Sequence, residues 1–421
     1  MSDVAQSVTA RAQRRPRTLL LLVLSATIMT LCMGLRQSMG LFVRPMTIDL
    51  GITASAISFV LALQNIVWGI SQPFMGMLAD RYGPRPVLMA SAAAYAGGLL
   101  LTAAARSAIG LDIGGFLMGL AVAGSGFGVL IGVVSRATPP ERRSQTVGAV
   151  TAAASIGTFV LAPVGQALIS GFGWRIALIG FAAIAGSIAL FSIPFGQENS
   201  ETPAAAAEDR QSLGDTLRAA ATHPGYVAMT VAFFACGFQL VFITTHLPSF
   251  LAICGLAPSV GATALGIIGL CNTAGTFGVG LLGARYSQKR LLALVYLLRT
   301  LAIIIYIAFP ISVASTVIFA AAMGLLWLSV APLVSVIIGK MFGLKHFSML
   351  YGFVFFSHQL GSFCGAWLGG VVFDYTGSYE MAWIGLIVIG LLAFALQWPM
   401  DDRPPAMRRR NVDLSTAATP A

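Results

Sequence analysis

The chain has 421 residues, of which 57% are hydrophobic and only 10% charged, and its mean hydropathy is +0.85. Soluble domains carry about a quarter of their residues as charges, so this composition excludes a water-soluble globular protein. The net charge of +10 does not point to nucleic acid, because the cations follow a membrane pattern. In a fold of twelve spans with a cytoplasmic N-terminus, Lys and Arg fall in the termini and the loops of one side, with five exceptions: Arg36, Arg44, Arg106, Arg175 and Arg299.

Twelve apolar runs approach or exceed the length of about 20 residues that a helix needs to cross a bilayer. They predict an all-α membrane protein in which nearly the whole chain lies in lipid. We expect the spans at 18–43, 54–78, 86–105, 113–135, 146–169, 175–195, 226–253, 259–282, 291–309, 313–338, 349–373 and 381–398.

The spans divide into two halves, and we expect two pseudo-symmetric six-helix bundles. Residues 1–17 are predicted to be a cytoplasmic segment, 18–196 the N-terminal bundle and 225–399 the C-terminal bundle. Residues 197–224 are expected to be a polar cytoplasmic linker with a short surface helix near residues 213–221. Residues 400–421 are predicted to be a solvated cytoplasmic tail.

A charged turn between the second and third spans supports this division. It contains Gly76, Asp80, Arg81, Gly83 and Arg85. A weaker copy follows in the other half, since Gly76 and Gly280, Arg81 and Arg285, and Tyr82 and Tyr286 are each 204 residues apart. The same spacing relates Arg136 to Lys340. These pairs indicate an internal repeat in which each half of the chain is one membrane unit. The second copy has Ala284 where the first has Asp80.

The charged turn resembles the loop between spans 2 and 3 of the major facilitator superfamily, and the resemblance covers about the whole chain. In that family the Asp and Arg of this loop latch the two halves together in one state and release them in the other. The resemblance therefore implies that Asp80, Arg81 and Arg85 act as such a latch, and the predicted latch segment includes Gly76 and Gly83.

Three further pieces look like the branch that contains oxalate/formate exchangers and monocarboxylate carriers. They are residues 36–42 (RQSMGLF), 173–175 (GWR) and 358–361 (HQLG). Members of that branch often carry an anion-binding Arg within span 8, whereas span 8 here reads GLCNTAG at 269–275. This departure puts a simple carboxylate substrate in doubt.

Ionisable residues inside spans are costly and usually face a cavity or a partner. None of the Asp or Glu residues falls in the middle of a predicted span, whereas Arg36 lies well inside the first one. A cavity with buried cations and no acid should prefer an anion, and Arg can hold a carboxylate with two parallel hydrogen bonds. Aligning Pro45 with Pro248 places Gln239 opposite Arg36 across the cavity. The alternative is that Arg36 extends to the surface or braces neighbouring carbonyls.

The other candidates are weaker. His246 and His358 could carry protons or act as hydrogen-bonded links between helices. Arg299 could brace a helix, extend to the cytoplasmic face or contact substrate. The remaining candidate substrate-binding residues are polar or aromatic side chains within spans: Asn272, Trp327 and Gln359.

The sequence contains no phosphate-binding loop, metal-ligand cluster or nucleophile set, so we expect neither an enzyme nor a cofactor. The first hypothesis is a secondary carrier of a small organic anion in the bacterial inner membrane, acting as a monomer by alternating access, with proton coupling left open. The second is an efflux carrier for amphipathic neutral or anionic compounds. The third, a membrane sensor without transport, would need an output module for which the linker and tail are too short.

Overall fold

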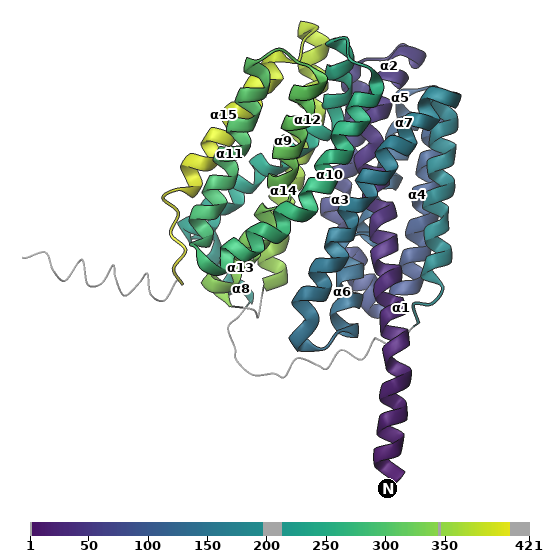
Figure 1. The fold of residues 1–421 in the computed structure, drawn as a ribbon, viewed down its shortest axis with the longest axis vertical. Helices are drawn as coiled ribbons and strands as arrows, with labels where there is room; N and C mark the ends of the chain where they lie inside the picture. The colour runs from purple at the N-terminus through teal and green to yellow at the C-terminus, as the bar shows by residue number, and fades with distance from the viewer. Residues whose placement is uncertain (1, 197–212, 344–346, 405–421) are drawn as a thin grey trace, which may run out of the picture.

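The computed structural model describes residues 2–196, 213–343 and 347–404; within these ranges, the side chains of 2–17, 140, 141, 143–145 and 213 are not described. The described elements are all helical, as the composition predicts (Figure 1). In chain order they are α1 (Ser2–Ser38), η1 (Met39–Phe42), α2 (Val43–Leu50), α3 (Ala54–Tyr82), α4 (Pro84–Ala104), α5 (Ala108–Ser125), α6 (Phe127–Ala137), α7 (Pro140–Ser192), α8 (Leu213–Ala221), α9 (Pro224–Ile253), α10 (Pro258–Arg285), α11 (Gln288–Ala308), α12 (Val313–Leu326), α13 (Val330–Phe342), α14 (Phe347–Thr376) and α15 (Glu380–Gln397).

The helices form two bundles that stand side by side, α1–α7 in one and α9–α15 in the other (Figure 1). Ten helices or helix pairs of the described residues are long and apolar enough to cross a membrane. One of them, within α7, consists of two helices that meet at Gly173, where φ is +81°. With α14, which has 30 residues, these account for the twelve predicted spans. The short helix α8 also lies where it was predicted.

Two spans differ from the prediction because each is broken near its middle. One span divides at Gly126 into α5 and α6, and the other divides between Leu326 and Val330 into α12 and α13. A break leaves backbone groups without their helical partners, which must then be satisfied by other groups inside the protein.

Glycines of α14 lie where this helix packs against α9, and their spacing of four residues puts them on one face of the helix. A Cβ on Gly361 would lie 2.0 Å from the carbonyl oxygen of Phe234, and one on Gly365 would lie 2.3 Å from that of Phe238. The small-residue face is therefore a close packing surface within the C-terminal bundle.

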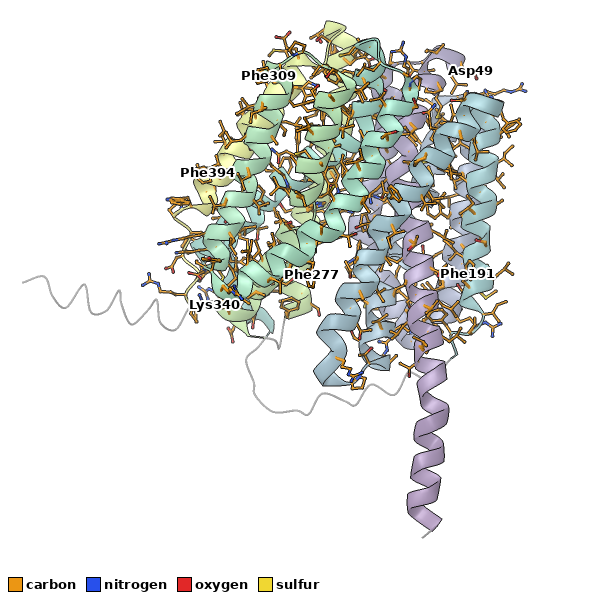
Figure 2. All side chains as sticks on the ribbon, viewed as in Figure 1. Asp49, Phe191, Phe277, Phe309, Lys340 and Phe394 are labelled. Atoms are coloured by element: carbon orange, nitrogen blue, oxygen red, sulfur yellow. The ribbon has the colours of Figure 1, made fainter. Side chains whose placement is uncertain are left out.

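The two ends of the molecule differ. We call the end that contains residues 80–85 and 285–289 the charged-turn end, and the end that contains residues 44–54 and 374–380 the opposite end; in Figure 2, Lys340 lies at the first and Asp49 at the second. Between the bundles, α14 contacts α3 and α10 contacts α7. The ribbons diverge toward the charged-turn end, where α6 and α13 lie (Figure 1).

Side chains confirm this asymmetry. The rings of Phe59 and Trp367 meet across the bundles at 5.7 Å, as do those of Trp68 and Phe355 at 5.3 Å. From Gly69 to its charged-turn end, α3 makes no hydrogen bond, ion pair or ring contact with the described residues of the C-terminal bundle. Met77 in this part of α3 is 59% exposed. The structure is thus closed at the opposite end and separated at the charged-turn end.

The prediction of a solvated tail is wrong for its first residues. Met400 is 3% exposed and Asp402 is 8% exposed, so this segment is packed against the C-terminal bundle rather than free in water. Ion pairs with lysines hold it there. The rest of the predicted tail, and most of the predicted linker, lie outside the described residues.

Candidate functional site

A small pocket lies between the two bundles. Its free space is about 10 Å³, close to the minimum that holds one water molecule, so the bundles must move apart before an organic solute fits. The pocket is lined from three helices and the turn that follows α1: by Arg36, Gln37, Met39 and Gly40, by Leu61, Gln64 and Asn65 of α3, and by Val241, Thr244 and Thr245 of α9.

The local fold places Arg36 at this interface. It lies in the last turn of α1, before the chain tightens into η1. A Cβ on Gly40 would lie 1.9 Å from the carbonyl oxygen of Thr244, so only glycine allows η1 to rest directly on α9. The guanidinium of Arg36 donates from Nη2 to Oδ1 of Asn65, and its central carbon lies 4.8 Å from the ring centroid of Trp68, within cation–π range.

A chain of hydrogen bonds leads from Arg36 into the other bundle. The backbone oxygen of Asn65 accepts from Nε2 of Gln359 at 3.1 Å. The Nδ1–H of His358 in turn donates to Oε1 of Gln359 at 3.2 Å. His358 is half-buried, whereas Gln359 is fully buried. The structure therefore brings together three of the predicted site residues, Arg36, His358 and Gln359, through Asn65.

Two buried nitrogens on the lining side chains lack a hydrogen-bond partner among the described residues. They are Nε of Arg36 and Nε2 of Gln64. A buried donor without an acceptor destabilises the protein by about 1–3 kcal/mol. None of the lining residues is Asp or Glu, so the pocket combines a cation with donors and has no acid to neutralise it.

The structure corrects the placement of Gln239. Its Nε2 donates to the carbonyl oxygen of Leu386 in α15 at 3.1 Å, and its side chain is fully buried within the C-terminal bundle. It therefore does not face Arg36 across the pocket. The polar side chains that α9 brings to the pocket are Thr244 and Thr245 instead.

His246 also lies inside the C-terminal bundle. Its Nε2 lies 2.6 Å from the carbonyl oxygen of Ala366 and must donate to it, and its Nδ1 lies 3.3 Å from the hydroxyl of Tyr379. Both ring nitrogens are engaged and the residue is fully buried. This arrangement fits a link between helices, which was one of its two interpretations.

Arg299 is fully buried and braces the broken span. Its Nε and Nη2 both donate to the carbonyl oxygen of Leu326, at 3.2 and 2.7 Å, and Nη2 also donates to that of Trp327. These carbonyls end α12, and a cation is favourable at a helix C-terminus. Arg299 therefore does not extend to the surface, and Trp327 lies at the break rather than among the residues lining the pocket.

Asn272 joins the break to the other bundle. Its Oδ1 accepts from the backbone nitrogen of Leu328 at 2.9 Å, and its Nδ2 donates to Oγ of Ser155 in α7 at 2.8 Å. The residue that replaces the expected cation of span 8 is thus an interbundle contact in this conformation.

Comparison with known proteins decides the family. The sequence model of the family described as Major Facilitator Superfamily matches residues 24–329 and 255–419. The chain belongs to the major facilitator superfamily. As a member it is a membrane transporter of small molecules, and the fold predicted from the charged turn and the repeat is confirmed.

Superfamily relatives match most of the chain at low identity. The chain is 26% identical over 373 residues to monocarboxylate transporter 13 of Rattus norvegicus, covering 86% of this chain and 84% of that protein. It is 22% identical over 386 residues to the oxalate:formate antiporter of Oxalobacter formigenes, covering 89% of each. Among solved structures, nucleoside transporter NupG superposes with a TM-score of 0.72 at 16% identity, over 90% of this chain and 98% of that one.

The superfamily's charged turn is in an open arrangement here. Asp80 pairs with Arg136 of the same bundle, with Oδ1 and Nη1 3.0 Å apart, and Arg81 lies over the ring of Tyr82. Gly83 makes the turn at a φ of +86°. Within the part of the chain that the structure describes, Asp80 and Arg81 make no hydrogen bond or ion pair with the C-terminal bundle, so a latch between the bundles stays a prediction for another conformation.

Sequence reasoning missed several of this carrier's pocket residues as site candidates, namely Gln37, Thr244 and Thr245. The adjacent threonines are a polar pair in the middle of a mostly apolar helix, VFITTHLP at 241–248. Such a pair costs little to bury because each hydroxyl can bond to a carbonyl of the preceding turn, as Thr244 does with Leu240, but it is a signal that could have found them.

Proposed function

We propose that this protein is a secondary carrier of a small organic anion, working by alternating access about the pocket at Arg36. The observation that supports the proposal most is the pairing of a half-buried guanidinium with a buried amide donor that has no acceptor among the described residues, in a pocket whose lining contains no acid. A carboxylate would supply the acceptors, and its bonds to Arg36 are of the strong, charge-assisted kind.

Relatives support the same solute class. Two of those described above are named for monocarboxylate and for oxalate and formate, and a third, 24% identical over 355 residues, is a nitrite extrusion protein of Bacillus subtilis. All of these solutes are small anions. The last name also keeps export open, and flux measured in vesicles of known orientation decides the direction.

The membrane arrangement is part of the proposal. The concentration of Lys and Arg in the loops of the charged-turn end supports a cytoplasmic position for that end and for both termini, in a bacterial inner membrane. The conformation described here would then be open toward the cytoplasm. One chain contains both bundles and the whole pocket, so a monomer suffices for transport.

His358 is the residue we propose to carry a coupled proton. It is half-buried, near the middle of α14, and is connected to Arg36 through Gln359 and Asn65. An anion that binds Arg36 would compete with Asn65 for the guanidinium and so change the environment of the imidazole. His246 is not a candidate, because both of its ring nitrogens are already engaged.

The test is replacement of Arg36. We expect Arg36→Gln to lower uptake of small carboxylates by at least about 100-fold in reconstituted vesicles, as loss of a charge-assisted bidentate contact of about 3 kcal/mol predicts. Arg106→Gln is the matched control, since Arg106 is exposed at the opposite end. Normal uptake by Arg36→Gln at equal protein abundance would overturn the anion proposal and leave the transporter fold untouched.

A further inference from the structure

The two charged turns differ in how their cations are paired. In the N-terminal bundle, Asp80 at the end of α3 pairs with Arg136 at the end of α6 at 3.0 Å. The equivalent positions in the C-terminal bundle, 204 residues later, are Ala284 and Lys340. Position 284 therefore offers Lys340 no carboxylate, whereas the equivalent Asp80 pairs with Arg136.

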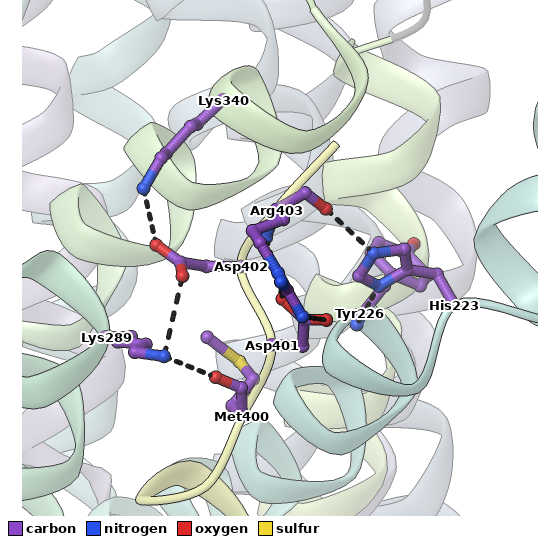
Figure 3. Close-up of polar contacts among 8 residues, drawn as sticks. All are labelled: His223, Tyr226, Lys289, Lys340, Met400, Asp401, Asp402 and Arg403. Atoms are coloured by element: carbon purple, nitrogen blue, oxygen red, sulfur yellow. Dashed lines mark hydrogen bonds and ion pairs between the residues drawn. The ribbon is translucent and has the colours of Figure 1, made fainter. Parts of the chain in front are cut away.

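An acid from another part of the chain pairs with Lys340 instead. Asp402, which follows α15, lies with Oδ2 2.6 Å from Nζ of Lys340 and with Oδ1 3.6 Å from Nζ of Lys289 (Figure 3). Lys289 also donates to the carbonyl oxygen of Met400 at 2.9 Å. Lys289 is itself the counterpart of Arg85 in the repeat, so one carboxylate pairs with two cations of the second charged turn and its neighbouring helix end.

The segment that carries Asp402 packs closely on the start of α9 and is hydrogen-bonded to it. Nε2–H of His223 donates to the carbonyl oxygen of Arg403 at 3.0 Å, and Nδ1 of the same ring accepts from the backbone nitrogen of Tyr226. A Cβ on Gly225 would lie 1.8 Å from the carbonyl oxygen of Asp401, so glycine is required for this approach. Figure 3 shows the segment passing between His223 and the two lysines.

We propose that Asp402 supplies the carboxylate that position 284 lacks, and that residues 400–404 are a clip that completes the charged-turn end of the C-terminal bundle. The clip joins the start of α9 to the charged-turn ends of α11 and α13, which the eroded turn no longer joins by itself. It is thus the counterpart, within the C-terminal bundle, of the Asp80–Arg136 pair.

The charge balance gives the clip a role in alternating access. In a form closed at the charged-turn end, Arg81, Arg85 and Arg136 of one bundle would approach cations of the other. Asp402 offsets two of those, Lys289 and Lys340, as Asp80 offsets Arg136. Without Asp402 the closed form would bring two basic rims together while Lys289 and Lys340 were no longer offset by its carboxylate, and like charges repel. Loss of Asp402 should therefore favour the conformation that is open at the charged-turn end.

Exchange of the acid between its two possible positions tests the proposal. We expect D402N to lower the Tm of the purified protein by about 3 °C or more and to raise hydrogen–deuterium exchange at the charged-turn ends of α11 and α13. A284D should be neutral or destabilising in the wild-type protein, where it adds a second acid beside Asp402. In D402N it should raise the Tm and restore protection in α11 and α13.

The control is A284D in a D80N background, where the missing acid belongs to the other bundle and no compensation is expected. Two results would overturn the proposal. One is a D402N protein with wild-type Tm and exchange. The other is an A284D substitution whose effect is the same with and without Asp402, which would show that the two positions do not serve the same lysines. Neither readout depends on the identity of the transported solute.

Discussion

Asp374 of the C-terminal bundle caps a helix of the N-terminal bundle, because its Oδ1 accepts from the backbone nitrogen of Ala54 at 2.9 Å. Its Oδ2 accepts from the next backbone nitrogen, that of Ser55, at 2.8 Å. These are unpaired donors of the first turn of α3, where a carboxylate is favoured by the helix dipole as well as by the hydrogen bonds. The contact closes the opposite end, while Asp80 at the charged-turn end pairs within its own bundle.

Asp374 should therefore act as the latch of the opposite end. We expect Asp374→Asn to weaken the closed form by about 1–2 kcal/mol, or roughly 5–30-fold in the ratio of closed to open molecules. The ratio can be read from the distance between labels at Ile109→Cys and Val313→Cys, two exposed positions at the starts of α5 and α12.

Asp49→Asn is the matched control for the latch. Asp49 lies at the same end, but its Oδ2 accepts from Trp174 and Arg175 of its own bundle, so its loss should leave the label distance unchanged. Identical distance distributions for Asp374→Asn and the wild-type protein would remove the latch role.

Helix phase explains which site residues the sequence could not place. Arg36 was predicted correctly to lie inside the protein near the bundle interface, because an ionisable residue within a span usually faces a cavity or a partner. Gln239 was placed by aligning the first helix of each half. The halves differ here, since α1 ends at Ser38 and continues as η1, whereas α9 runs unbroken to Ile253. A shift of one residue along a helix rotates the side-chain direction by about 100°. Aligning the two halves by sequence therefore does not determine which face of each helix lines the pocket.

Long-range partners explain the other errors. The broken span at Leu326 depends on a guanidinium from α11, and the seat of Asp402 depends on lysines at 289 and 340. Neither relation has a local sequence signal. The repeat, in contrast, could be predicted because it is a pattern of the sequence itself. It predicted the two bundles, and it showed that Ala284 replaces the acid found at Asp80 in the first half.

Arg299 should matter for stability rather than for solute recognition. We expect Arg299→Leu to destabilise the protein by about 3 kcal/mol, because the terminal carbonyls of α12 lose charge-assisted bonds in a buried site. Arg299→Lys keeps the charge but cannot reproduce the fork that reaches both Leu326 and Trp327, so it should recover only part of the loss. Thermal unfolding with and without a bound carboxylate measures both effects. A wild-type Tm for Arg299→Leu, or a selective loss of the ligand-induced shift, would contradict the bracing role.

The two membrane histidines should separate in a pH profile. If His358 carries the coupled proton, His358→Gln flattens the dependence of initial uptake on pH, because the imidazole that binds the proton is gone. His246→Gln should lower the Tm, since it breaks the contacts to Ala366 and Tyr379, and should keep the wild-type profile. Uptake by proteoliposomes measures both. Equal profiles for His358→Gln and the wild-type protein would exclude His358 as the proton site.

The two acids of the clip should lose their stabilising effects at different pH values. Burial raises the pKa of Asp402, but the hydrogen bond and charge of Lys340 and the charge of Lys289 outweigh this and lower it below its ordinary value. The hydrogen bonds of Arg403 lower the pKa of Asp401 to about 2. A carboxyl group whose pKa is lower in the folded protein stabilises the fold above its unfolded value of about 3.9, and this effect is lost as the pH falls through the folded pKa.

The Tm difference between the wild-type protein and D402N should therefore be constant above about pH 5 and shrink below about pH 4. The difference between the wild-type protein and D401N should persist to lower pH, because the pKa of Asp401 falls to about 2. Thermal unfolding at intervals from about pH 3 to 7 measures both differences, with D80N as a control on the other bundle. A D402N difference that does not change over this range would mean that the charge of Asp402 is not what holds the clip, since protonation would then leave its stabilising contacts intact.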